Sequence, residues 1–309
     1  MILQYFSNNI KTVLQNDEIK AIHKNIEEIR LRVNKPIILK TNTTNIISNY
    51  MVKIEDILET LEKVCENSIY AYQNQISNGF ITIRGGHRVG ISGSTVIENG
   101  KVINIKYVQG LNFRIAKEII CVSDNMMKYI INTNNNDIFN TLIVSPPGAG
   151  KTTLLRDIIR NVSNGMENIN FTGCKVGVVD ERGEIAAMYK GIPQNNIGIQ
   201  TDVMENIPKP LGMRMLIRSM SPEVIACDEI GSKEDIEAII YAICSGVKGI
   251  FTAHGENISD LYNNTEINIL INKHILDRII FLDKKAKKGQ ISEIYYLANN
   301  QYIRKDGIR

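Results

Sequence analysis

The chain has 309 residues, of which 43% are hydrophobic and 22% charged, a composition typical of a globular protein with a sizeable core. Its 36 Lys and Arg barely exceed its 33 Asp and Glu, and this balance argues against a protein that coats nucleic acid or anionic lipid. Five cysteines without a C-x-x-C pair predict a reduced intracellular protein with neither disulfides nor a zinc site. We expect neither a signal peptide nor a transmembrane helix, because no apolar run is long enough, and we therefore expect a cytoplasmic protein.

Residues 1–120 predict a small α+β domain. Apolar residues recur at helical spacing over residues 54–70, whereas branched and polar residues alternate over residues 79–105. Asn99 and Gly100 interrupt this alternation as a tight hairpin turn does. We therefore expect a helix and a β-hairpin in this part of the chain.

A cationic loop lies within this first domain, where Arg84, His87 and Arg88 stand among three glycines over residues 83–90. Arginines on such a loop can reach nucleotide phosphates from a second domain or subunit, as arginine fingers do. The pattern is equally typical of a glycine-rich turn with exposed charges. A nucleic-acid contact is a third alternative, which the near-neutral charge and the absence of interleaved aromatic residues disfavour.

The pattern changes after a predicted linker at residues 121–139. From residue 140 to 309, short apolar strands alternate with helices, which is typical of a parallel sheet covered on both faces. The predicted strands are 141–144, 176–179, 224–227 and 249–252, the predicted helices are 151–162, 211–220 and 233–245, and residues 279–303 are expected to add antiparallel strands at the sheet edge. The predicted fold class is therefore α/β, with a RecA-like P-loop NTPase domain after a smaller α+β domain.

A glycine-rich loop follows the first of these strands and opens a helix. It reads Ser145, Pro146, Pro147, Gly148, Ala149, Gly150, Lys151, Thr152 and Thr153. The glycines let backbone N–H groups surround phosphate oxygens, and the helix N-terminus favours their negative charge. Lys151 would neutralise the β- and γ-phosphates, and the Thr152 hydroxyl would hold Mg²⁺. Ser145 occupies the position where the usual motif has its first glycine, but the glycines that surround the phosphates remain.

Two carboxylates, Asp228 and Glu229, end another apolar strand. In a P-loop fold, the Asp at this position lies near Mg²⁺ through water, and the Glu polarises the attacking water. The alternative is that these carboxylates only cap the next helix. Together with the loop, they predict hydrolysis of a nucleoside triphosphate.

Polar residues also follow two further strands of the predicted sheet. Asp180, Glu181 and Glu184 follow one strand, and Thr252 and His254 end another. Because ligands of parallel α/β sheets bind at the carboxyl ends of strands, we expect these residues to converge on the nucleotide. His254 is equally compatible with a structural hydrogen bond, and the glutamates with salt bridges to a neighbouring arginine.

With these motifs, the chain resembles the stage III sporulation protein AA family of endospore-forming bacteria. The resemblance covers essentially the whole chain and rests on five segments: 28–32 (EIRLR), 78–90 (NGFITIRGGHRVG), 146–153 (PPGAGKTT), 180–186 (DERGEIA) and 227–231 (CDEIG). More distantly, the chain is similar to the ATPases of type II secretion, type IV pili and type IV secretion. In that superfamily an N-terminal domain and a RecA-like domain form a homo-hexameric ring, with ATP between the two domains.

The resemblance also implies roles for individual residues. The acidic box matches Asp180, Glu181 and Glu184, the histidine box matches Thr252 and His254, the catalytic carboxylate matches Glu229, and the N-terminal arginines that touch the phosphates match Arg84, Arg88 and Arg114. We therefore expect Glu229, Lys151, Glu184, His254 and Arg88 to act in catalysis, with Thr152, Asp228 and Glu181 near Mg²⁺. The chain departs from the superfamily at Asp228, where the secretion ATPases usually have Gly, and at Ser145.

The resemblance further implies a place in the cell. It predicts an ATPase in the mother-cell cytoplasm that uses ATP and Mg²⁺ at the face of a secretion-like channel to the forespore. Its partner would be a membrane subunit of that channel. Two other functions remain open on the sequence alone: a nucleotide-gated assembly module with little turnover, and a RecA-like motor that nucleic acid stimulates. No base-reading motif distinguishes ATP from GTP.

Overall fold

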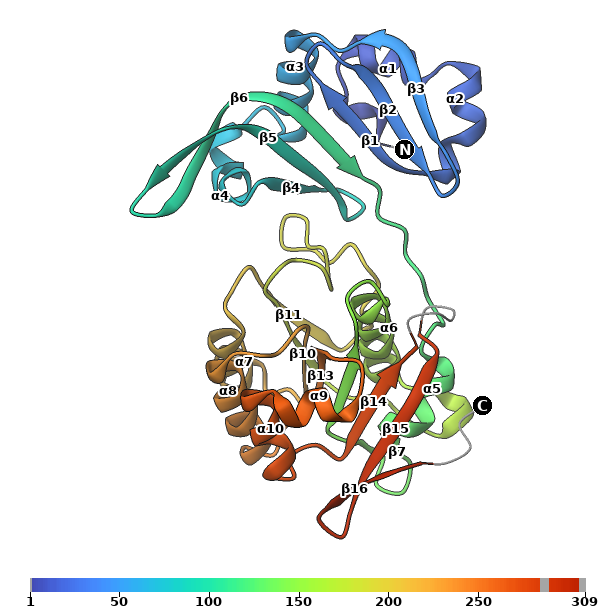
Figure 1. Cartoon of the computed structure of the whole chain (residues 1–309), viewed down its shortest axis with the longest axis vertical. Coiled ribbons are helices and arrows are strands. Elements are labelled where there is room, and N and C mark those ends of the chain that lie inside the picture. Colours follow the sequence, from blue (N-terminus) through green and yellow to red (C-terminus); the bar gives the residue numbers. More distant parts are fainter. Residues whose placement is uncertain (1, 284–288, 306–309) are drawn as a thin grey trace. The chain divides into compact units, whose positions relative to one another are not determined.

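A computed structural model describes residues 2–283 and 289–305. The chain forms two compact units (Figure 1): one consists of Met1–Lys117 and Ala187–Gln194, and the other of Glu118–Ala186 and Asn195–Arg309. We call Ala187–Gln194 the returning segment. Within the described part of the chain, every helix is too short or too polar to span a membrane.

The first unit contains a six-stranded antiparallel sheet with the order β3-β2-β1-β6-β5-β4 (Figure 1). Its strands are β1 (Ile26–Arg32), β2 (Pro36–Thr41), β3 (Asn45–Met51), β4 (Phe80–Ile83), β5 (His87–Glu98) and β6 (Lys101–Arg114), and its helices are α1 (Asn8–Leu14), α2 (Asp17–Ile22), α3 (Ile54–Val64) and α4 (Gln73–Ser77). Phe6 and Phe113 are fully buried in its core, with ring centroids 4.3 Å apart. Along β1, Ile29 and Leu31 are buried in this core, whereas Arg30 and Arg32 are exposed on the other face of the sheet.

The turn between β5 and β6 confirms the predicted hairpin. Asn99 and Gly100 both have positive φ, at 50° and 75°. Two successive positive φ angles define the tight turn that matches the right-handed twist of paired strands. The helix predicted over residues 54–70 is also present, but it ends at Val64.

The returning segment packs within the first unit, although its chain neighbours belong to the second. Glu66 accepts a hydrogen bond from the Tyr189 hydroxyl and forms an ion pair with Lys190. The backbone N–H of Gly85 donates to Gln194 Oε1 at 2.8 Å. Sequence patterns gave no sign of this arrangement, because it depends on contacts between residues about 110 to 120 positions apart.

The carboxylate of Asp56 joins three parts of the first unit. It accepts hydrogen bonds from the Ser7 hydroxyl at 3.0 Å, the Asn9 amide at 3.1 Å, the Tyr50 hydroxyl at 2.7 Å and the Lys53 backbone N–H at 3.0 Å. Burial alone would raise the pKa of Asp56, but these hydrogen bonds outweigh burial and lower the pKa from its usual value. Burial and the bond to Asp56 raise the pKa of Tyr50 to about 12.

Replacing Asp56 with Ala is expected to lower the free energy of unfolding of the first unit by about 3 kcal/mol, because several donors lose their acceptor. The depressed pKa also gives this contribution a pH dependence. It is fully present above the unfolded pKa of about 3.9 and disappears as the pH falls through the lower folded value. Urea unfolding at neutral and acid pH would measure both effects, with Asp17→Ala at an exposed site as the control. Equal stability of Asp56→Ala and the wild type at neutral pH would contradict this role.

The second unit contains an eight-stranded sheet with the order β11-β10-β12-β13-β9-β14-β15-β16. Its strands are β9 (Thr141–Ser145), β10 (Val176–Asp180), β11 (Thr201–Glu205), β12 (Val224–Cys227), β13 (Lys248–His254), β14 (Arg278–Leu282), β15 (Ile291–Ala298) and β16 (Gln301–Arg304), and its helices are α5 (Asp124–Ile130), α6 (Lys151–Asn164), α7 (Lys209–Met220), α8 (Lys233–Cys244), α9 (Ile258–Asn263) and α10 (Thr265–Asn272). All four predicted parallel strands are present. Residues 279–303 differ in part from the prediction, because β14 pairs parallel with β9 and only β15 and β16 continue antiparallel.

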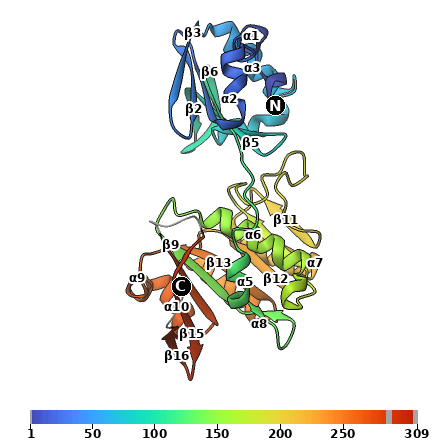
Figure 2. The ribbon, with the colours of Figure 1, turned by 90° about the vertical axis from the view of Figure 1, so that its right-hand side faces the viewer.

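Helices cover both faces of this sheet. Alternate strand residues such as Leu142 and Val144 pack with α7, α8, α9 and α10 in one apolar cluster. Helix α6 contacts β9, β10 and β13 through residues outside that cluster, and α5 lies beside α6 (Figure 2). The strand side chains alternate between the two layers, as expected for a parallel sheet buried on both faces.

The stretch predicted as a linker, residues 121–139, holds ordered structure of the second unit. It contains α5 and a short hairpin of β7 (Ile131–Asn132) and β8 (Asp137–Ile138). The buried carboxylate of Asp157 accepts hydrogen bonds from the backbone N–H groups of Cys121 and Ser123, at 3.1 and 2.8 Å. These bonds attach the stretch to α6, which the composition of the stretch did not indicate.

Candidate nucleotide site

The loop between β9 and α6 has the backbone that the glycine pattern predicted. Gly148 and Gly150 have positive φ, at 80° and 89°, and Gly150 is the N-cap of α6. Any other residue would be strained there, so both glycines are required by the turn. Ser145 is a buried residue at the end of β9 without a positive φ, and its position therefore does not require the glycine of the usual motif.

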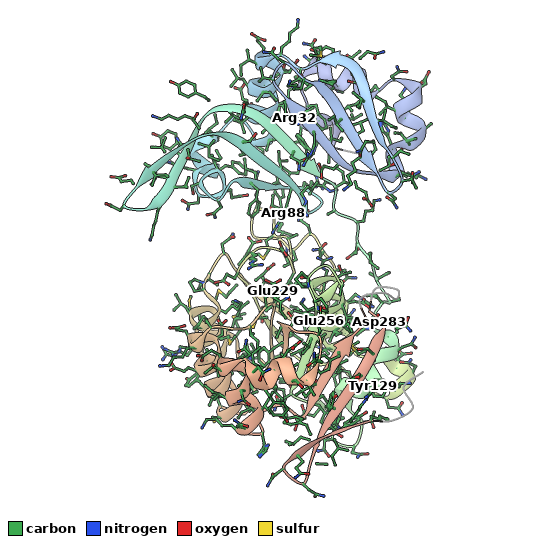
Figure 3. All side chains as sticks on the ribbon, in the orientation of Figure 1. Arg32, Arg88, Tyr129, Glu229, Glu256 and Asp283 are labelled. Atoms are coloured by element: carbon green, nitrogen blue, oxygen red, sulfur yellow. The ribbon has the colours of Figure 1, made fainter. Side chains whose placement is uncertain are left out.

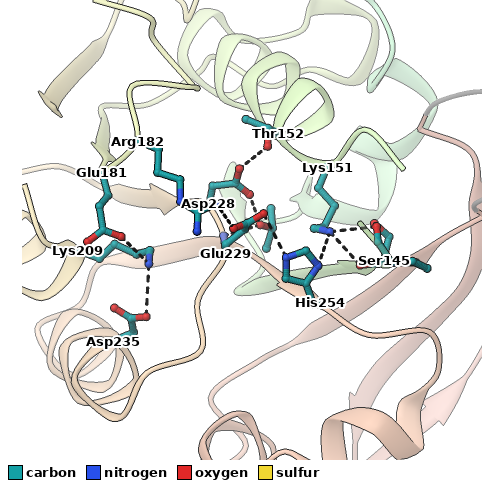
Figure 4. A network of polar contacts seen from close by, with 12 residues as sticks. Ser145, Lys151, Thr152, Glu181, Arg182, Lys209, Asp228, Glu229, Asp235 and His254 are labelled. Carbon is teal, nitrogen blue, oxygen red and sulfur yellow. Dashed lines mark hydrogen bonds and ion pairs between the residues drawn. The ribbon is translucent and has the colours of Figure 1, made fainter. Parts of the chain in front are cut away.

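Lys151 lies under this loop with only 5% of its surface exposed. Its Nζ donates to the carbonyl oxygens of Ser145 and Pro146, at 2.9 and 3.3 Å, and lies 3.1 Å from His254 Nδ1 (Figure 4). Burial lowers the pKa of Lys151 from its usual value, while the carboxylates of Asp228 and Glu229 act in the opposite direction. The ammonium group is thus held at the start of a helix, where an anion is favourable.

Asp228 joins the ends of three elements. Its carboxylate accepts hydrogen bonds from the hydroxyl groups of Thr152, at the start of α6, and Thr252, on β13. The Thr252 hydroxyl oxygen in turn accepts the backbone N–H of Glu229 at 2.8 Å. The carboxylate beside Thr152 provides the oxygen ligands that Mg²⁺ prefers in proteins, so these residues fit a magnesium ion.

Glu229 follows β12 in a left-handed backbone conformation, with φ of 51°. For a residue with a side chain this conformation costs of order 1–3 kcal/mol, and such residues concentrate at functional sites. Its carboxylate lies 2.6 Å from Arg182 Nη1 and 3.2 Å from His254 Nε2. Because His254 Nδ1 faces the Lys151 ammonium, a neutral imidazole would accept there and donate to Glu229 through Nε2.

The three residues of the acidic box lie at different depths. Asp180 is buried, and its carboxylate accepts the backbone N–H groups of Glu184, Ile185 and Ala186 at 2.8, 3.0 and 2.8 Å. It therefore shapes the loop that carries Glu184. Arg156 on α6 holds the same loop by donating to the carbonyl oxygens of Ile185 and Glu184, at 2.8 and 2.7 Å. Sequence reasoning missed Arg156, because a helix arginine with backbone partners leaves no motif.

Glu181 pairs with a lysine that the sequence also did not indicate. Lys209 Nζ lies 3.0 Å from Glu181 and 3.6 Å from Asp235 (Figure 4). Burial alone would lower the pKa of Lys209, but these two carboxylates raise it above its usual value. A pocket beside them is lined by Glu181, Arg182, Glu184, Lys209, Asp228 and Glu229.

The arginines predicted to touch phosphates belong to the first unit. Arg84 lies in the turn between β4 and β5, and Arg88 on β5 is directly opposite Arg114 on β6. The Arg88 guanidinium lies 4.4 Å from the centroid of the Phe80 ring. Figure 3 labels Arg88 in the first unit. The remaining predicted site residues, from Pro146 to His254, are in the second unit.

A strand that leads through a glycine loop into a helix, with carboxylates at neighbouring strand ends, defines the P-loop NTPase class. Solved structures share this fold, with a RecA-like domain after an N-terminal domain. The Yersinia pseudotuberculosis ATPase DotB gives a TM-score of 0.61 at 14% identity and covers 96% of this chain and 81% of its own. The Legionella pneumophila ATPase DotB gives a TM-score of 0.57 at 16% identity, and the match covers 87% of this chain and 75% of that one. The pilus retraction motor PilT with bound ADP also gives a TM-score of 0.57 at 16% identity, and the match covers 86% of this chain and 77% of that one.

The chain belongs to the family described as "Sporulation stage III, protein AA", which matches residues 1–301. It is 39% identical over 284 residues to Stage III sporulation protein AA of Bacillus subtilis (strain 168), covering 92% of this chain and 91% of that protein. It is also 28% identical over 162 residues to Protein SEEDLING PLASTID DEVELOPMENT 1 of Arabidopsis thaliana, covering 49% of this chain and 21% of that protein. The family resemblance stated from the sequence motifs is thereby confirmed.

Proposed function

We propose that the protein is a Mg²⁺-dependent ATPase that powers or assembles a sporulation-specific, secretion-like channel between mother cell and forespore. The observation that carries this proposal is the single polar network in which Lys151, Thr152, Asp228, Glu229 and His254 meet at the N-terminus of α6. Nucleotide hydrolysis needs a cation, a metal ligand and a carboxylate base at one place, and this network supplies all three.

The proposed roles follow from the contacts of each side chain. Lys151 would exchange its carbonyl partners for the β- and γ-phosphates, and the backbone N–H groups of the loop would surround them. Thr152 and Asp228 would hold Mg²⁺, which when bound neutralises phosphate charge. Glu229 would accept the proton of the attacking water, and His254 would orient Glu229 from its other side.

The remaining roles follow from the superfamily resemblance. Arg84, Arg88 and Arg114 would contact the phosphates, Glu181 would lie near the metal, and Glu184 would assist catalysis. We further propose a homo-oligomer, a hexameric ring like that of the secretion ATPases, that acts in the mother-cell cytoplasm. It would lie at the membrane through a membrane subunit of the channel.

Phosphate release by the purified chain tests the catalytic proposal. ATP is expected to be hydrolysed with Mg²⁺ present, and release is expected to stop with EDTA and return when Mg²⁺ is added. GTP run in parallel would show which base is preferred. Undiminished release in EDTA would contradict the metal role. Strong stimulation by single-stranded DNA or RNA at low salt would instead support a nucleic-acid motor.

A further inference from the structure

A groove of about 330 Å³ lies on the uncovered face of the sheet in the first unit, over β1, β6 and β5. Its lining includes Arg30, Arg32, Gly90, Gly110 and Asn112. None of these residues takes part in the nucleotide network of the second unit. Figure 3 shows Arg32 on this sheet.

Strand register places the lining residues in two rows. Arg30, Asn112 and Gly90 lie directly opposite one another across β1, β6 and β5. Arg32 and Gly110 form the neighbouring row on the same face. Residues two apart on a strand are separated by roughly 6.6–6.8 Å, so the two arginines repeat at that spacing along the groove.

The groove is cationic. Arg30 donates through Nε to Glu28, which fixes its position, and about half of the Arg30 side chain remains exposed. Arg32 forms no ion pair with any residue in the described part of the chain. Glu28, the partner of Arg30, lies directly opposite Arg114 in the next row of the same face.

Gly90 and Gly110 lie in the floor of the groove, which also holds one unsatisfied acceptor. A Cβ on Gly110 would lie 2.8 Å from Ser92 Oγ and 3.1 Å from the Leu31 carbonyl oxygen, so the packing requires glycine there. Asn112 Oδ1 is buried and has no hydrogen-bond partner. An unsatisfied buried acceptor is costly, and a ligand that brings an N–H group would remove that cost.

We propose that this groove binds an extended acidic peptide segment of a protein partner, with carboxylates at alternate positions. An extended chain presents alternate side chains to one side at the same repeat as Arg30 and Arg32. Each guanidinium can then take one carboxylate in a bidentate pair. The peptide backbone approaches the groove beside Gly90 and Gly110 and supplies the N–H donor for Asn112.

Fluorescence anisotropy with the full-length chain, without nucleotide, tests this proposal separately from the ATPase activity. The probe is a labelled Gly-Glu-Val-Glu-Val-Glu-Gly peptide, and its matched control is the isomer Gly-Glu-Glu-Val-Val-Glu-Gly, in which no two Glu residues are two positions apart. We expect the alternating peptide to bind about tenfold more tightly than the isomer, as the loss of one well-placed ionic contact implies. Equal affinity of the two peptides would overturn the proposal.

Two variants locate the binding on the groove. Arg32→Gln is expected to weaken binding of the alternating peptide about tenfold, whereas Lys101→Gln, the same charge change at the exposed start of β6, leaves it unchanged. Asn112→Leu is expected to weaken binding without lowering the unfolding temperature, because it removes an unsatisfied acceptor. Wild-type affinity in Arg32→Gln would overturn the proposal. So would displacement of the peptide by inorganic phosphate or by an oligothymidylate at lower concentration than by unlabelled peptide.

Discussion

Replacing Lys151 with Ala is expected to lower the rate of ATP hydrolysis by at least about 100-fold, because the phosphates lose their only buried cation in the described P-loop. In the wild type the ammonium is already held at the start of α6 by two carbonyl oxygens. These neutral partners are weaker than a phosphate oxygen, so nucleotide can replace them. Alanine offers no cation at all, and nucleotide affinity should fall together with turnover.

Phosphate release and binding of a fluorescent ATP analogue would measure both losses for Lys151→Ala. Lys273→Ala, at an exposed position after α10, is the matched control and should retain wild-type values. Thermal unfolding should be compared for the two variants, because removal of a buried lysine also changes packing. A folded Lys151→Ala protein that hydrolyses ATP at the wild-type rate would remove the basis of the proposed function.

Glu229→Gln is expected to separate binding from turnover. The amide keeps the shape of the carboxylate but cannot take a proton from water, so hydrolysis should fall by about 10²–10⁴-fold. Lys151, Thr152 and Asp228 are unchanged, so ATP affinity should stay near that of the wild type. The same variant would therefore hold the protein in its ATP-bound state.

Single-turnover hydrolysis together with ATP binding would measure this separation. Glu237→Gln, on the exposed side of α8, is the control for loss of one negative charge. Measurement of molecular mass for Glu229→Gln, with and without ATP, would also show whether nucleotide drives assembly of a ring. Hydrolysis at the wild-type rate would assign the base to another residue, and loss of ATP binding would make Glu229 a structural residue.

The parts of the site that are formed by residues close together in the sequence could be predicted from the sequence. The strand, glycine loop and helix around Lys151 are consecutive in the sequence, over residues 141–164, and their backbone has the predicted form. The carboxylates of Asp228 and Glu229 could be placed at the same edge because parallel strands end together. The sequence predicted that Thr152 and Asp228 both lie near Mg²⁺, but it did not predict the hydrogen bond between them.

Contacts between distant residues could not be predicted in this way. Glu229 forms an ion pair with Arg182, and Arg156 donates a hydrogen bond to the loop that carries Glu184. Both contacts depend on the orientation of side chains in the folded protein, which leaves no periodic pattern in the sequence. Strand β11 was missed because its residues TDVME are all half-buried and form no apolar run. The row of Arg30 beside Asn112 likewise depends on register between strands about 80 residues apart.

The returning segment has a consequence for how the protein can be divided. The chain leaves the second unit after Ala186 and re-enters it at Asn195. At this point the Asn195 N–H donates to the Ala186 carbonyl oxygen at 3.2 Å. A gene truncated after Lys117 would encode all six strands of the first unit but would leave Glu66 without Tyr189 and Lys190. An exchange of N-terminal domains between relatives would preserve these contacts only if two separate gene segments moved together.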